Sequence, residues 1–287
     1  MQAIARDIYI ETTFLGVTLG VINTPHGLIQ IDAPPSADDG RTWRASMINL
    51  DSGMERILIN LDVHADRTLG VRTMECTIIA QEKTAQIFRS RPNLFKVQPD
   101  ETGSDWEHLP GLGNIRWTPP EITFTQQMAI YWGESPVLVE YHPGPNAGAS
   151  WVIVPDARLV FVGDAVVPNQ PPFLANADIQ AWLESLKELL SPAFRGFTIV
   201  SGRGGVVSVD DVRGQVKFLK KVDARLERLA NKKQSSEVSE SLISNLLEDF
   251  QFPETLKGQY SNRLRYGLTH YLARHYHDLN TILLEEN

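Results

Sequence analysis

The stretch that decides how this sequence is interpreted is Ile59-Asn-Leu-Asp62-Val-His64-Ala-Asp66-Arg67-Thr-Leu-Gly70. It overlaps a largely apolar run from Glu55 to His64, which is typical of a strand buried on both faces. Asp62, His64 and Asp66 alternate, and residues two apart on an extended segment point the same way. Carboxylates and an imidazole on one side of a segment are suited to metal binding or acid–base chemistry. The alternative is a polar strand end with a local salt bridge to Arg67.

The composition argues against several classes of protein. The 287 residues include 27 Lys and Arg against 35 Asp and Glu, a net charge of −8, so we expect no nucleic-acid partner. Cys76 is the single cysteine, which excludes an intrachain disulfide and a cysteine-rich zinc site and favours a reducing, cytoplasmic location. The first residues lack the pattern of a signal peptide, and no apolar run is long enough to span a bilayer, so we expect no membrane association.

The pattern of predicted elements changes along the chain. Short strands and a few helices alternate through the first two thirds, and the remainder is helical. Ser208-Val-Asp-Asp211 resembles a capping box and precedes a long helix with an apolar stripe over residues 212–232. A polar break over residues 232–236 follows it. We therefore divide the chain into a mixed domain, residues 1–232, and a C-terminal helical extension, residues 237–287.

A family resemblance is carried by five landmarks that occur in order over roughly residues 14–205. The central one, Asp62-Val-His64-Ala-Asp66-Arg67 with Gly70 in register, resembles the metal-binding signature His-x-His-x-Asp-His of the metallo-β-lactamase superfamily. The others resemble that family's early strand pair, its Pro-Gly-His-Thr-x-Gly turn, its Gly-Asp and its final Gly-His-Gly, and they are Leu28–Asp32, Tyr141–Gly148, Phe161–Asp164 and Ser201–Gly204. The resemblance implies an α/β (α+β) fold, a four-layer αββα sandwich, to which the C-terminal helices are added.

The ligand set that the resemblance implies is largely replaced in this sequence. The family uses seven ligand positions, five of them histidine, and three residues of that set are kept: His64, Asp66 and Asp164. The other four positions hold Asp62, Arg67, Pro145 and Arg203. Proline has no side-chain donor, and a protonated guanidinium has no lone pair to give a metal. The Asp62 carboxylate could still bind a hard ion through oxygen.

Two predictions are open for the residues at these ligand positions: they hold no metal, or they hold a single ion. We predict that Arg67 and Arg203 neutralise Asp66 and Asp164 in the metal's place, because buried unpaired carboxylates are costly. In that case no cofactor is bound. The alternative is at most one divalent ion (Zn, Mn or Fe) on the remaining ligands Asp62, His64 and Asp164. Asp66 would be catalytic only if that metal is bound.

Three functional hypotheses follow. The first is a pseudoenzyme or a binder of a small anionic ligand, with Arg67, Arg203 and His142 as the ligand-binding residues. The second is a hydrolase that uses the single ion. The third is an oligomeric scaffold, such as a homodimer, that acts through the helical extension. The proline-rich loop over residues 166–176 corresponds to a region that borders the active-site cleft in the family the sequence resembles.

Overall fold

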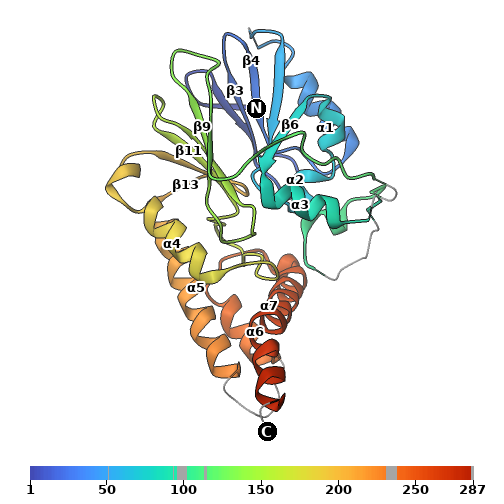
Figure 1. Ribbon diagram of the computed structural model, residues 1–287, viewed down its shortest axis with the longest axis vertical. Coiled ribbons are helices and arrows are strands. Elements are labelled where there is room, and N and C mark those ends of the chain that lie inside the picture. The colour runs from blue at the N-terminus through green and yellow to red at the C-terminus, as the bar shows by residue number, and fades with distance from the viewer. Residues whose placement is uncertain (51, 93, 96–101, 113–114, 231–237, 286–287) are drawn as a thin grey trace.

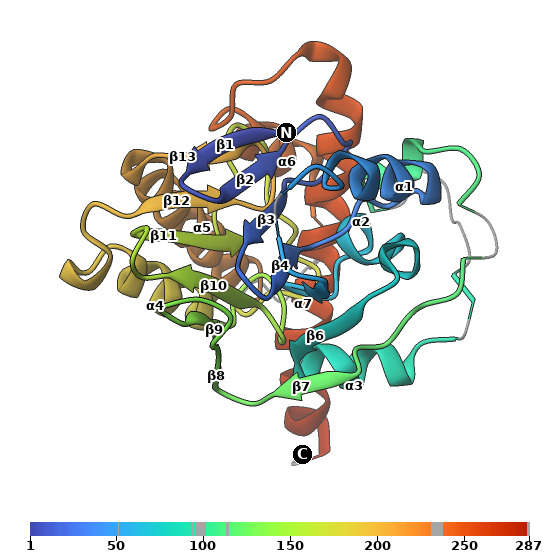
Figure 2. The same cartoon turned by 90° about the horizontal axis from the view of Figure 1, so that it is seen from above.

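The computed structural model describes residues 1–50, 52–92, 94–95, 102–112, 115–230 and 238–285. Its strands form two sheets, which lie face to face in Figure 1 and Figure 2. The first sheet has the order β1-β2-β3-β4-β5-β6-β7; it is antiparallel up to β4 and parallel from β4 to β7. Its strands are β1 (Gln2–Ala5), β2 (Ile8–Glu11), β3 (Leu19–Asn23), β4 (Gly27–Ile31), β5 (Glu55–Ile59), β6 (Thr77–Gln81) and β7 (Ile122–Phe124).

The second sheet has the order β13-β12-β11-β10-β9-β8. Its neighbouring strands are antiparallel except for the parallel pair β11 and β12. Its strands are β8 (Gln127–Ile130), β9 (Val137–Tyr141), β10 (Ser150–Val154), β11 (Leu159–Gly163), β12 (Thr198–Ser201) and β13 (Gly205–Val207).

An apolar layer separates the two sheets, and helices cover their outer faces. Strand β4 is buried along its whole length because it packs on both sides. Ile29 belongs to the layer between the sheets, whereas Leu28 packs with Trp43 of α1 (Ala37–Ser46) on the outer face. Helices α4 (Ile179–Leu189) and α5 (Val209–Ala230) pack on the second sheet. The predicted four-layer αββα sandwich is confirmed.

Local sequence signals are confirmed where short-range contacts decide the structure. The Asp211 N–H donates to the Ser208 hydroxyl (3.2 Å), and the Ser208 N–H donates to the Asp211 carboxylate (2.8 Å), which is the predicted capping box of α5. The sequence also predicts hairpin-like breaks at Gly133-Glu-Ser-Pro136 and Pro155-Asp-Ala157. They connect the antiparallel pairs β8–β9 and β10–β11.

The prediction of a strand that continues to His64 is wrong. Strand β5 ends at Ile59, and His64 is the N-cap of the short helix α2 (Ala65–Thr68). The imidazole Nδ1 of His64 accepts the N–H of Asp66 at 3.2 Å, which places Asp66 in the first helical turn. Asp62, His64 and Asp66 therefore do not alternate along one extended segment, because a helix begins between them.

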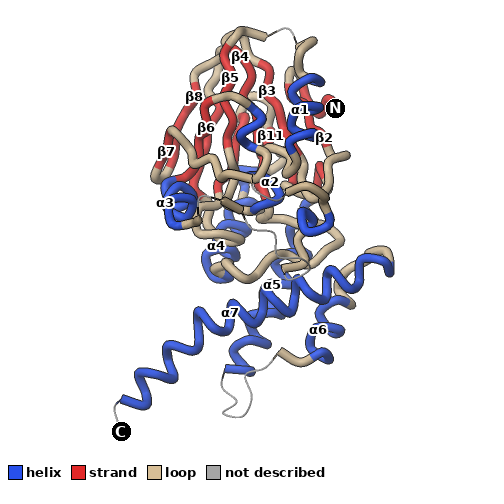
Figure 3. The backbone as a smooth tube through the Cα atoms, turned by 90° about the vertical axis from the view of Figure 1, so that its right-hand side faces the viewer, coloured by secondary structure: helices blue, strands red, loops and turns tan. Residues whose placement is uncertain are grey.

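The C-terminal helices α6 (Glu240–Leu247) and α7 (Lys257–Glu285) lie against the helices of the second sheet, and α7 runs out beyond the rest of the protein (Figure 1, Figure 3). Leu246 and Leu264 belong to the same apolar cluster as Trp182 of α4. The predicted boundary at residues 232–236 lies outside the described residues, so the division into two domains stays a prediction. No described helix combines the length and the apolar character needed to cross a membrane.

Candidate functional site

The predicted site residues come together where several strands end. Asp32 follows β4, and the segment that holds Asp62, His64, Asp66 and Arg67 follows β5. Since β4 and β5 are parallel, their carboxyl ends lie side by side. On the other sheet, Asp164 and Arg203 follow the parallel strands β11 and β12. The contacts between these residues show that both pairs of strand ends meet at one place.

Arg67 is completely buried and contacts three carboxylates. Its Nη1 donates to Asp32 at 2.9 Å, and its Nε lies 3.2 Å from an oxygen of Asp62. Its Nη2 donates to Asp164. All three nitrogens of this guanidinium therefore face an acidic oxygen.

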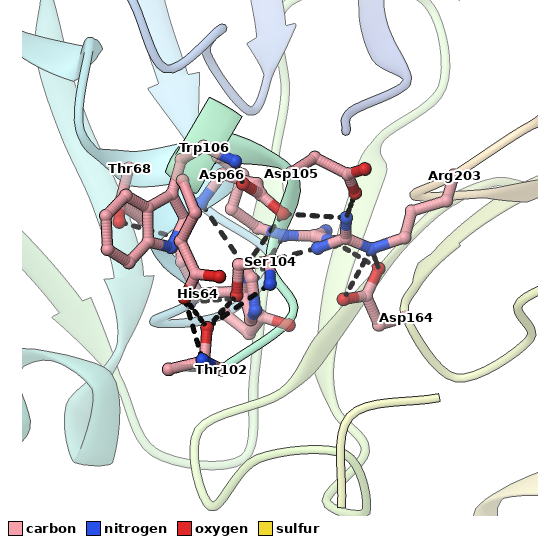
Figure 4. A network of polar contacts seen from close by, with 12 residues as sticks. His64, Asp66, Thr68, Thr102, Ser104, Asp105, Trp106, Asp164 and Arg203 are labelled. Carbon is pink, nitrogen blue, oxygen red and sulfur yellow. Dashed lines mark hydrogen bonds and ion pairs between the residues drawn. The ribbon is translucent and has the colours of Figure 1, made fainter. Parts of the chain in front are cut away.

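Arg203 is also buried, and it contacts a second set of acceptors (Figure 4). Its Nε lies 3.1 Å from both oxygens of Asp164, and its Nη1 donates to Asp66 at 2.7 Å and to Asp105 at 3.0 Å. Its Nη2 lies 3.1 Å from Nδ1 of His64. Asp164 thus bridges the two guanidinium groups.

The predicted pairing of Arg67 and Arg203 with Asp66 and Asp164 is confirmed by these contacts. Sequence reasoning missed two further partners, Asp32 and Asp105. The position of Asp32 at the end of the early strand pair was a usable signal. Asp105 had none, because it lies in a proline-rich connection far along the chain from each of its partners.

Acidic groups outnumber basic ones in this network. Arg67, Arg203 and the buried Arg263 of α7 face five carboxylates, those of Asp32, Asp62, Asp66, Asp105 and Asp164. Burial raises the pKa of Asp32 to about 7 and the pKa of Asp66 to about 6, although the neighbouring arginines oppose the rise. Burial also favours a high pKa at Asp164, but Arg203 and Arg67 outweigh it and hold that pKa well below its usual range.

His64 is an uncharged hydrogen-bond acceptor in this arrangement. Burial and the positive charge of Arg203 both lower the pKa of the imidazole well below its usual value. Its Nδ1 accepts the Asp66 N–H and faces Arg203, which places the ring proton on Nε2. The ring of Phe173 packs against it, with the two ring centroids 4.2 Å apart.

A cleft of about 170 Å³ lies beside the network and is open to solvent on one side. His64 and Pro145, two of the predicted ligand positions, lie in its wall. The predicted loop contributes Phe173, Leu174, Ala175 and Asn176, which confirms that this loop borders the cleft. Helix α7 supplies the opposite part of the wall through Arg263, Tyr266 and Gly267. The C-terminal extension thus helps to form the cleft.

Arg91 is a cation in the wall of the cleft, and one of its N–H donors has no hydrogen-bond partner within the described part of the chain. Its Nη2 lies 3.3 Å from the carbonyl oxygen of Val63, and its guanidinium carbon lies 4.4 Å from the centre of the Trp117 ring. Its Nη1 is buried and has no hydrogen-bond partner among the described residues. Burial lowers the pKa of Arg91 to about 10, so the group is still charged at neutral pH. Nothing in the sequence distinguished it from other surface arginines.

His142 lies away from the cleft. Its ring stacks on Trp151, with centroids 3.6 Å apart and planes at 14°, and it lines a separate surface hollow beside α4. The structure therefore does not bring it to Arg67 and Arg203. The role in ligand binding predicted for these three residues stays a prediction.

Comparison with known proteins agrees with this architecture. Residues 73–193 match the family model of the metallo-β-lactamase superfamily. The fold is similar to that of a metallo-β-lactamase from Pontibacter korlensis, with a TM-score of 0.60 and 16% sequence identity over 76% of this chain and 97% of that one. These matches support membership of the metallo-β-lactamase superfamily. The DIM-1 metallo-β-lactamase is also similar, with a TM-score of 0.59 and 15% identity over 77% of this chain and 96% of that one. No curated protein matches the sequence.

The residues at the superfamily's metal position do not fit a dinuclear zinc centre. Two of the positions are guanidinium groups, which cannot donate a lone pair, and their positive charge opposes that of a cation. The oxygens of Asp62, Asp66 and Asp164 already accept N–H groups. Among the described residues, Asp62, His64 and Asp164 do not form a group whose ligand atoms all lie within 4.8 Å of one another. The single-ion site stays a prediction that this geometry does not support.

Proposed function

We propose that this chain is a non-hydrolytic member of its superfamily, whose cleft binds a small organic anion without a metal. The observation that carries the proposal is the buried pairing of Arg67 and Arg203 with the carboxylates at the metal position. Zinc hydrolases use the ion to activate water and polarise the bond that breaks. Protonated guanidinium groups cannot bind and activate a water as a metal ion does, and the N–H groups of Arg67 and Arg203 that could polarise a bond already face carboxylates.

Because Arg67 and Arg203 are paired with carboxylates, a residue other than these two would hold the anion. Every nitrogen of Arg67 and of Arg203 lies near a carboxylate oxygen or His64 Nδ1, although Arg67 Nε, 3.2 Å from Asp62, makes no hydrogen bond to a described residue. Arg263 is equally engaged, by Gly103, Gln170 and Asp105. The buried Nη1 of Arg91 is left to bind a ligand oxygen, which supports Arg91 as the anchor in the cleft.

The size and lining of the cleft favour a single-ring carboxylate. Cavities of about 150 Å³ accommodate benzene, and this cleft of about 170 Å³ has Trp106 and Phe173 in its wall. Asn146 and Asn176 add hydrogen-bonding side chains. Aromatic rings, a few polar groups and one available cation together suit a flat molecule with one acidic end.

Thermal unfolding in the presence of benzoate or of phosphate tests this proposal. Benzoate is expected to raise the melting temperature of the wild-type protein, and Arg91→Gln should weaken that binding at least tenfold. Arg89→Gln is the matched control, because Arg89 lies in the last turn of α3 (Glu82–Ser90), just before its C-cap Arg91, with an exposed side chain. A benzoate effect that is equal in both variants would contradict the assignment of Arg91. Turnover of β-lactam or thioester substrates by the purified protein would contradict the non-hydrolytic proposal itself.

The lone cysteine supports the reducing, cytoplasmic location that we propose for this protein. The scaffold and homodimer hypotheses receive less support, because the apolar stripes of α6 and α7 pack against the rest of this chain and are not exposed to a partner. Leu246, Leu264 and Leu268 are buried within the chain's own core.

A further inference from the structure

A second group of polar side chains lies outside the cleft, in the hollow beside α4. Glu140 is in β9 and His142 follows that strand directly, so the two side chains are two positions apart on extended backbone. Glu188 is in the last turn of α4. One ligand atom from each of the three residues lies within 4.8 Å of the others, and no other such group of three occurs among the described residues.

The histidine at the centre of this group is held in place. Its ring is buried and stacks on Trp151, which is fully buried and pairs with Glu140 across the β9–β10 ladder. The backbone N–H of His142 donates to Ala149 at 3.0 Å. The Ser185 hydroxyl donates to the carbonyl of Pro143 at 2.8 Å, which fixes α4 beside this strand end. The donor atoms are thus presented by three connected and ordered parts of the fold.

The two carboxylates lie near different nitrogens of the His142 ring, so a single ion would use one ring nitrogen and one carboxylate would turn toward it. Nε2 of His142 lies 3.4 Å from a Glu140 oxygen, and Nδ1 lies 3.7 Å from a Glu188 oxygen. Two ligands of a tetrahedral zinc ion lie about 3.3 Å apart, because each bond is about 2.0 Å long. The Glu188 side chain is about half exposed, at 54%, so it is free to turn toward either ring nitrogen.

The surrounding charge also favours a cation. Glu184 and Glu188 both line the hollow beside His142, and the single lysine in its lining, Lys187, is paired with Glu184 at 3.1 Å. The carboxylates of Glu140 and Glu188 therefore remain for His142 or for an ion. Two carboxylates and one imidazole form a mixed oxygen and nitrogen ligand set, which zinc and manganese accept.

We propose that Glu140, His142 and Glu188 form a divalent cation site, distinct from the superfamily's metal position, that takes zinc or manganese with water completing the coordination. The hollow leaves the outer side of the ion open to solvent. This inference is independent of the function proposed for the cleft, because no residue is shared between the two sites.

Equilibrium dialysis of the full chain against zinc or manganese, followed by elemental mass spectrometry, tests the site. The wild-type protein is expected to retain one equivalent. Glu188→Gln should weaken retention at least tenfold, and so should His142→Phe, which keeps a ring on Trp151 but removes both nitrogens. Glu184→Gln is the matched control: it removes the same charge one turn earlier on α4, where the carboxylate pairs with Lys187 and is not a proposed ligand, so it should weaken retention far less than Glu188→Gln does.

Paramagnetic broadening locates the ion directly. Addition of Co²⁺ to the wild-type protein is expected to broaden the ring signals of His142 and to leave those of His26, which stacks on Trp132, sharp. Absence of zinc and manganese retention by the wild-type protein would overturn the proposal and leave the three residues as a hydrogen-bonded surface group. Retention that is equal in Glu188→Gln and Glu184→Gln would overturn it as well.

Discussion

Single residues decide whether this fold can carry metal chemistry. Arg67 and Arg203 stand where the sequence resemblance places metal ligands, and each is buried among several carboxylates. Removing one partner of such a pair leaves an uncompensated charge in the interior, and this costs far more than the intact pair contributes. The two arginines and their acidic partners are therefore coupled.

Arg67→Met is expected to lower the free energy of unfolding by about 3 to 5 kcal/mol, because it leaves Asp32, Asp62 and Asp164 without their shared cation. Arg213→Met is the control. Its ion pair with Asp210 is on the surface, so the change should stay below about 0.5 kcal/mol. Urea unfolding of both variants measures the difference. Equal losses would show that Arg67 does not hold the network together.

Asp32→Asn tests the elevated pKa of Asp32. The native pKa of about 7 lies above the ordinary value of 3.8, so the folded protein keeps a proton that the unfolded chain releases. The contribution of Asp32 to stability is thus complete at low pH and decreases as the pH rises to about 7, by roughly 1.4 kcal/mol per unit. The variant lacks this decrease.

Urea unfolding of the wild type and of Asp32→Asn at about pH 5 and about pH 7.5 measures this effect. The difference in free energy of unfolding should shift in favour of the variant at the higher pH. A difference that is the same at both pH values would contradict the elevated pKa.

At the scale of elements, α7 and the segment of residues 102–106, which it contacts, form one side of the cleft. The Arg263 Nε donates to the carbonyl of Gly103 at 2.9 Å, and Gln259 donates to Asp105 at 2.9 Å. Gly103 has φ +67°, and a Cβ placed there would lie 2.5 Å from the carbonyl oxygen of Gln259. This close approach requires glycine for two reasons, the left-handed backbone and the contact with the helix.

Gly103→Ala is therefore expected to separate α7 from the cleft wall and to destabilise the protein by about 2 to 4 kcal/mol. Gly111→Ala is a matched control, since Gly111 has φ +77° but no atom of the described residues lies within 4 Å of where its methyl group would be. It should cost only the strain of a left-handed alanine, about 1 kcal/mol. Thermal unfolding compares the two, and hydrogen exchange of α7 should rise in Gly103→Ala alone. Unchanged exchange there would contradict the role of this contact in docking α7.

Elements whose signals are local could be predicted from the sequence. The capping box at Ser208 and the hairpin breaks depend on neighbours a few residues away, and both are confirmed. The arginine pairs were predictable because a family pattern fixes where those positions meet. Asp105 and Arg91 were not, since their contacts depend on how an irregular segment lies on the folded body. The start of α2 was missed because the apolar pattern of β5 continues past its last paired residue.

The whole molecule has the αββα sandwich of the metallo-β-lactamases, and ion pairs lie where its strand ends meet. The strand ends still converge on one place, and the cleft beside it persists, with α7 as an additional wall. The fold alone does not determine the function. Ion pairs in place of ligands predict a protein whose cleft takes up no metal, and the separate group around His142 predicts a single surface ion.

Elemental mass spectrometry of Glu188→Gln, purified without chelator and dialysed against zinc and then manganese, tests this account most directly. The substitution removes the surface site, so any metal that remains must be held elsewhere. We predict less than about a tenth of an equivalent, because Arg67 and Arg203 occupy the superfamily's metal position. A full equivalent of metal that disappears when Asp62→Ala and His64→Ala are added would contradict it and establish a metal centre in the cleft.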